Sequence, residues 1–172
     1  MRGRPERNEA APYYFSYIDQ VAGDDVVSLL EAQATATLPL LESISEQKSL
    51  DRYEPGKWSI SEVLGHINDC ERLFTLRAFW FARGFETPLP SFDQNVGVRA
   101  AKANDIAWAR HVDEFRVTRA ATIAFFRNLP DDAWMRSGIA SDNRFTVRAL
   151  AYVAAGHVAH HRRILEERYL GD

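Results

Sequence analysis

The sequence has one cysteine, no excess of positive charge and no long apolar run. The single cysteine, Cys70, cannot form an intramolecular disulfide, and CxxC metal and redox motifs are excluded. We therefore expect a reducing, cytoplasmic location. The most apolar stretch, 149–155, is followed by Gly156 and His157 and is far shorter than the ~20 residues of a membrane span. Residues 1–11 mix arginine, glutamate and proline without a following apolar segment, so no signal peptide is expected.

The charge balance argues against nucleic acid as a partner. Lys and Arg number 21 against 24 Asp and Glu, which gives a net charge of -3. The 172 residues are 46% hydrophobic and 26% charged, as in an ordinary globular protein of one domain. We expect residues 1–24 to form a partly flexible N-terminal arm, frayed over residues 1–11. Residues 25–172 should then form a single domain.

Sustained period-two alternation between hairpin turns is also missing, whereas four segments show apolar spacings of three and four. This pattern predicts an all-α fold, with four amphipathic helices packed as a four-helix bundle. We expect the helices over about 25–43, 59–83, 105–128 and 146–169. A long crossover joins the second helix to the third and holds a short helix near 94–101. Residues 131–144 are expected to be loop.

Helix ends are marked by specific residues. Ser59 and Glu62 have the spacing of a capping box, in which each side chain satisfies a backbone donor at the helix start. Thr146 is a suitable N-cap for the last helix, and Gly84 is a suitable stop for the second. These signals fix the ends of the two helices that carry most of the histidines.

The histidines are the residues most suited to chemistry. His157 and His161 lie on the apolar stripe of the last long helix, at positions where a core normally holds leucine. An i, i+4 pair lets two imidazoles reach one divalent cation, and His66 from the second helix points toward apolar neighbours and can supply a third nitrogen. Three histidine ligands leave a position for water or substrate. Zinc suits this set best, and nickel, iron and manganese suit it too.

Each of these residues also has a purely structural interpretation. A buried histidine is more often a hydrogen-bonded core residue than a ligand. His160 could replace His161 as a ligand, although it lies off the stripe. Cys70, one turn after His66, could also ligate, but a small buried hydrophobe is favoured. His111 has charged neighbours and is expected on the surface.

Charged residues near the histidines leave two alternatives open. Asp69 and Glu71 could orient a ligand ring, or could pair with Arg72 and Arg77 on the helix surface, which is favoured. Arg119 falls on the inward stripe of the third helix, where an unpaired guanidinium is costly. It therefore either pairs with a carboxylate or contacts an anionic substrate.

Four segments of the sequence resemble the DinB-like proteins: 55–59 (PGKWS), 63–72 (VLGHINDCER), 146–150 (TVRAL) and 156–161 (GHVAHH). Residues 82–84 and 88–90 are similar to the branch called DinB_2. The resemblance implies a bundle of up-down-down-up topology, often a homodimer, with a divalent metal held by His66, His157 and His161. Family members include thiol-dependent S-transferases and mycothiol-dependent maleylpyruvate isomerase, and others are presumed metal-dependent hydrolases.

Three functions follow as hypotheses. The first is a metal-dependent S-transferase that conjugates a low-molecular-weight thiol to an electrophilic small molecule. The second is a metal-dependent hydrolase, and the third is a noncatalytic, stress-related protein whose metal only joins two helices. Peptidase activity loses support because Val158 stands where the HExxH motif has its glutamate.

Overall fold

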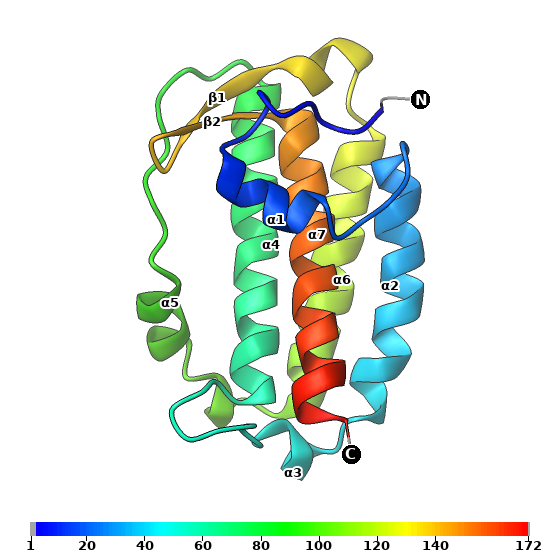
Figure 1. The fold of residues 1–172 in the computed structure, drawn as a ribbon, viewed down its shortest axis with the longest axis vertical. Coiled ribbons are helices and arrows are strands. Elements are labelled where there is room, and N and C mark those ends of the chain that lie inside the picture. Colours follow the sequence, from blue (N-terminus) through cyan, green and yellow to red (C-terminus); the bar gives the residue numbers. More distant parts are fainter. Residues whose placement is uncertain (1–2, 172) are drawn as a thin grey trace.

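The computed structural model describes residues 3–171. Four long helices lie side by side (Figure 1): α2 (Val26–Ser43), α4 (Ile60–Ala82), α6 (Trp108–Arg127) and α7 (Val147–Ile164). The shorter elements are η1 (Pro12–Tyr14), α1 (Phe15–Ile18), α3 (Glu46–Ser49), α5 (Gln94–Ala101), η2 (Ala103–Asp105), η3 (Asp131–Met135), β1 (Ser137–Ala140), β2 (Asn143–Thr146) and η4 (Leu165–Tyr169). The fold is thus mostly helical, with one small antiparallel sheet. Within the described chain, no helix is both long and apolar enough for a membrane span.

The helix boundaries follow the signals in the sequence. Ser59 and Glu62 form the expected capping box at the start of α4, and the Thr146 hydroxyl accepts a hydrogen bond from the Ala149 backbone at the start of α7. Gly84 has a φ of 81°, which suits the turn that follows α4. The short helix α5 occupies the predicted span, and the last helix continues through the π-helical turn η4.

The expectation of a loop over residues 131–144 is wrong. This stretch forms η3 and most of a hairpin, in which β1 and β2 pair antiparallel with Ser137 opposite Thr146. Ser141 and Asp142 have φ of 50° and 58°, as a tight hairpin turn requires. Each strand has only four residues, so period-two alternation is too short to detect in the sequence. Figure 1 shows the hairpin crossing one end of the long helices.

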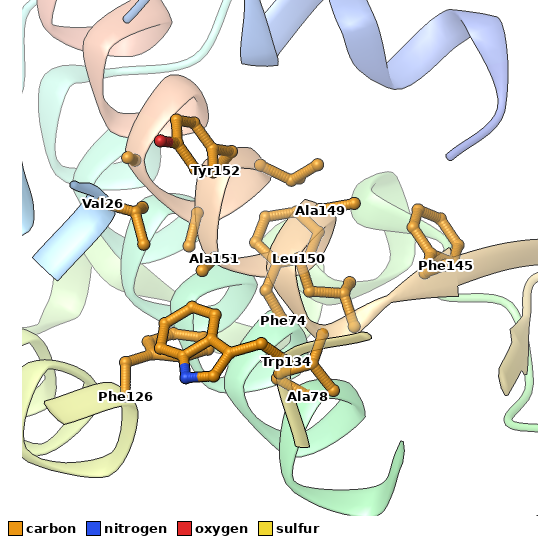
Figure 2. Close-up of a cluster of buried hydrophobic side chains, with 14 of the residues drawn as sticks. Val26, Phe74, Ala78, Phe126, Trp134, Phe145, Ala149, Leu150, Ala151 and Tyr152 are labelled. Atoms are coloured by element: carbon orange, nitrogen blue, oxygen red, sulfur yellow. The ribbon is translucent and has the colours of Figure 1, made fainter. Parts of the chain in front are cut away.

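Two apolar clusters fill the interior. The first lies toward the hairpin and includes Phe74, Phe126, Trp134 and Leu150 (Figure 2). The second lies toward the other end of the long helices and includes Leu64, Phe115 and Val158, among others. Arg119 on α6 and His157 on α7 lie between residues of the first cluster and residues of the second, so these two buried polar groups, with the partners described below, form a polar layer between the clusters.

The N-terminal segment is packed rather than frayed over its described residues. Glu9 is 3% exposed and accepts a hydrogen bond from the Thr146 hydroxyl at 2.7 Å, and its carboxylate pairs with Arg148. Phe15 is also buried, and α1 packs against α7. The two helices approach closely at Gly156, where an added Cβ would lie only 2.0 Å from the Tyr17 carbonyl oxygen. The sequence pattern missed this packing because the segment is short and has no long amphipathic repeat.

Candidate metal centre

Helices α4 and α7 bring three imidazoles together in the polar layer. The Nε2 atom of His157 lies 3.1 Å from Nε2 of His66 and 3.1 Å from Nε2 of His161. One ligand atom from each of the three residues lies within 4.8 Å of the other two. These are the three histidines that the helical stripes and the family resemblance selected. The structure therefore brings the three predicted rings together, and their role as ligands stays a prediction.

Hydrogen bonding cannot satisfy this cluster by itself. A neutral imidazole nitrogen either carries one proton or offers one lone pair, so Nε2 of His157 cannot make full hydrogen bonds to two other Nε2 atoms at once. A cation accepts a lone pair from all three nitrogens. Ligand nitrogens at ~2.1 Å from a tetrahedral zinc lie about 3.4 Å apart, close to the separations seen here. The donor set fits a divalent metal.

Burial keeps these imidazoles neutral, which is the form that binds metal. Burial lowers the pKa of His66 to about 4. Burial, with a smaller contribution from His66 and His160, lowers the pKa of His161 to about 3. The pKa of His157 lies well below 6.5, again chiefly because of burial and then because of the neighbouring imidazoles. At neutral pH the three lone pairs are available.

Aromatic side chains hold the rings in place. The Trp58 ring centroid lies 5.0 Å from that of His66, and the Phe74 centroid lies 5.5 Å from that of His157. Tyr17 of α1 meets the His157 ring edge-on at 5.3 Å. Tyr17 carries no signal in the sequence, because only the tertiary packing of α1 on Gly156 brings it to the site.

Among the described residues, the group of converging ligand atoms contains none of the other candidate ligands. Cys70 lies with its sulfur 3.6 Å from Nδ1 of His66, and burial is the main cause that raises the thiol pKa to about 12. The sulfur is buried, as expected for a small apolar side chain. The ring of His160 contacts Tyr17 and His161 edge-on, outside the cluster of three. Asp69 is partly exposed and lies 3.8 Å from Arg72, as the surface interpretation predicts.

Two predictions about buried polar groups are wrong. His111 is 2% exposed, and its Nε2 donates to the Ala103 carbonyl at 2.9 Å, so it joins α6 to η2 inside the protein. Glu71 is also 2% exposed and does not pair with Arg72 or Arg77 on the surface. Both residues were misplaced because charged sequence neighbours suggested an exposed position, whereas successive residues of a helix point in different directions.

Glu71 instead pairs with Arg119, which is the carboxylate partner that the first of the two alternatives for that arginine expects. The Arg119 Nη2 atom donates to Glu71 at 2.9 Å, and Nη1 donates to the Gln33 side chain at 2.7 Å. Gln33 in turn donates to the Ala155 carbonyl at 2.8 Å. This network joins α2, α4, α6 and α7 beside the histidines. Arg119 is therefore a structural cation with its own carboxylate.

Residues of the histidine cluster line two pockets. The first, about 230 Å³, is lined by His66 and His157 and by residues that include Tyr17 and Arg77. The second, about 210 Å³, is lined by His161 together with Trp58 and the rings of Tyr53 and Tyr169. Apart from His66, His157, His161 and Cys70, none of these lining residues was selected from sequence.

Comparisons with known proteins agree with this fold. A family model described as the DinB superfamily matches residues 29–165. The structure titled "YfiT from Bacillus subtilis is a probable metal-dependent hydrolase with an unusual four-helix bundle topology" is 18% identical, with a TM-score of 0.68 and coverage of 95% of this chain and 93% of that chain. The mycothiol-dependent maleylpyruvate isomerase is 13% identical, with a TM-score of 0.69, and the match covers 84% of this chain and 61% of the isomerase. No curated protein matches the sequence.

Proposed function

Since the chain belongs to the DinB superfamily, and since its three buried histidines fit a divalent cation, we propose that it is a metal-dependent enzyme of the thiol S-transferase type. In this proposal His66, His157 and His161 hold the metal, with zinc favoured over nickel, iron or manganese. The reaction forms a carbon–sulfur bond between a low-molecular-weight thiol, which loses its proton, and an electrophilic small molecule, which releases its leaving group as an anion.

The observation that carries the proposal is that the triad contributes to the lining of two pockets. His66 and His157 line one pocket, and His161 lines the other. A conjugation needs room for two organic reactants, one on each side of the reactive centre. Hydrolysis needs room for one organic substrate and a water molecule. Two pockets that meet at one histidine cluster therefore favour the two-substrate reaction.

The chain's own residues are arranged for an external nucleophile. When bound, a divalent cation supplies Lewis acidity, which lowers the pKa of a thiol or of water that reaches it. The Cys70 thiol has a raised pKa and is buried, so it does not provide the nucleophile. Burial is the main cause that raises the pKa of Tyr17 well above its usual value, so the phenol stays protonated. Tyr17 can donate a hydrogen bond into the pocket but cannot serve as a base near neutral pH.

A metal-dependent hydrolase is the second candidate, because the structural neighbour from Bacillus subtilis is described as a probable one. The same cluster would then activate water. A noncatalytic protein, in which the metal only joins α4 to α7, is the third. The three candidates differ in whether turnover needs a thiol, needs only water or does not occur.

The finer features of the fold are also part of the proposal. We propose the up-down-down-up order for α2, α4, α6 and α7, which the colour sequence along the helices in Figure 1 supports. We also propose a cytoplasmic homodimer. Exposed apolar side chains on α4, among them Leu76 and Phe79, line a surface groove with residues of α6 that a second copy would cover. Sedimentation of the parent and of Leu76→Glu tests this, with a dimer expected in the parent and a monomer in the variant.

Activity assays with metal-loaded protein test the reaction. A small thiol and an aryl halide electrophile should give conjugate with the parent and with the surface variant Arg162→Gln, and none with His157→Ala. Nitrophenyl ester hydrolysis without thiol should be absent. Ester turnover without thiol would support the hydrolase, and conjugation retained in metal-free His157→Ala would overturn both enzymatic proposals.

A further inference from the structure

The first pocket contains a second feature besides the histidines. Arg77 is 2% exposed, and its Nη2 atom donates to the Pro90 carbonyl at 3.1 Å and to the Ser141 hydroxyl at 2.8 Å. Its buried Nε atom has no hydrogen-bond partner. No carboxylate among the described residues lies within ion-pair distance of this guanidinium. Burial lowers its pKa but an arginine still carries its charge at neutral pH.

A comparison with Arg119 shows how unusual this is. Arg119 is buried to the same degree and pairs with Glu71, as a buried charge normally does. The residues that line the first pocket include tyrosines, a serine and a glutamine, but no aspartate or glutamate. Arg77 therefore faces a pocket with one positive charge and no negative charge to balance it.

Arg77 and His66 lie on the same face of α4. They are three helical turns apart, which places their Cα atoms about 16 Å apart along the helix axis. Cys70, Leu73 and Phe74 lie between them on this face and line the same pocket. Arg77 and His66 both line the first pocket. The pocket thus runs from the histidine cluster to the guanidinium along an apolar strip.

We propose that Arg77 binds a carboxylate of the substrate while the reactive end of the same molecule lies at His66 and His157. The planar fork of a guanidinium matches a carboxylate, and the ligand supplies the charge that the protein omits. The apolar strip contacts the chain that joins the two ends. This inference rests on the proposed function for the reactive end and specifies an acidic small molecule with an apolar middle as the substrate class.

Cobalt-loaded protein provides a test through its visible absorption spectrum. The probes are ω-mercaptoalkanoates of increasing length and the ω-mercaptoalkanols of the same lengths. At the length that spans the pocket, the parent should bind the carboxylate at least about tenfold more tightly than the alcohol, a difference typical of one charge-assisted contact. Equal affinity of acid and alcohol at every length in the parent would overturn the proposal.

Two variants and one control sharpen the result. Arg77→Gln should bind acid and alcohol equally, and Arg77→Lys should keep part of the preference. The control Arg72→Gln removes an exposed arginine from the same helix and should retain the full preference. A preference that persists in folded Arg77→Gln would also overturn the proposal.

The test separates this inference from the proposed function. If cobalt does not bind, the proposed metal function fails, and Arg77 can still be tested on metal-free protein. Alkanoates should then raise the melting temperature more than the matched alkanols in the parent, and equally in Arg77→Gln. Equal shifts in the parent would overturn the carboxylate subsite.

Discussion

The two sides of the polar layer differ in how their buried polar groups are balanced. On one side, Glu71 forms an ion pair with Arg119, and Arg119 and Gln33 extend this network to four helices, so the buried guanidinium has its counter-charge within the protein. On the other side, three neutral imidazoles converge next to two pockets and cannot all be satisfied by hydrogen bonds. Buried polar groups that are balanced serve the fold, and those left unbalanced beside a pocket indicate a ligand.

The largest effect on stability is expected from breaking the balanced side. Glu71→Gln leaves the buried Arg119 guanidinium without its counter-charge, which should cost on the order of 3 kcal/mol in the free energy of unfolding. Urea denaturation measures this. The metal content should be unchanged, since the histidines are intact. Arg162→Gln, which breaks an exposed pair with Glu166, is the control and should cost less than about 0.5 kcal/mol. Equal losses in the two variants would show that the network is not a structural element.

A smaller effect is expected from disturbing the packing of α1 on α7, which covers the histidine side of the polar layer. Gly156→Ala places a methyl group 2.0 Å from the Tyr17 carbonyl oxygen, so α1 must move away from α7. We expect a loss of about 1 to 3 kcal/mol from overpacking and faster proteolysis near α1. Gly65→Ala is the matched control, because its added Cβ would lie 3.4 Å from Ala103, an ordinary contact. Equal free energies of unfolding for the two variants would show that the close packing of α1 on α7 at Gly156 does not contribute to stability.

The smallest effect is expected from the anchor of this cover, and it depends on pH. Burial raises the pKa of Glu9, but hydrogen bonds from Arg148, the Glu6 backbone and Thr146 more than offset this, so its pKa lies below 4.5. A lowered carboxyl pKa stabilises the fold above the unfolded value, and this contribution is lost as the pH falls through the folded value. The free energy of unfolding of the parent, measured with urea, should therefore fall below about pH 4.5. In Glu9→Gln the free energy of unfolding should depend less on pH in this range. An identical pH dependence in the two proteins would contradict the role of Glu9 as an anchor of the N-terminal segment.

Much of the histidine side could be predicted from the sequence. A stripe of apolar residues places His157 and His161 one helical turn apart, and the caps at Ser59 and Thr146 fix where α4 and α7 begin. These are local signals, set by helix geometry and by hydrogen bonds within a few residues. They predicted the long helices and the proximity of the three rings.

The remainder depends on contacts between distant segments. Glu71 and His111 are buried beside partners on other elements, Arg119 and the Ala103 carbonyl. Tyr17 reaches the site because Gly156 lets α1 approach α7. Arg77 is indistinguishable in the sequence from a surface arginine. No pattern of spacing along the chain encodes these pairings.

The metal content of the protein tests the central claim most directly. It should be measured on protein expressed without a histidine tag and purified without an affinity metal, beside His157→Ala and the neighbouring control His160→Ala. We predict close to one equivalent of zinc, nickel, iron or manganese in the parent and in His160→Ala, and none in His157→Ala. A parent that holds no metal and takes up none on titration would contradict the account, and so would undiminished metal in His157→Ala.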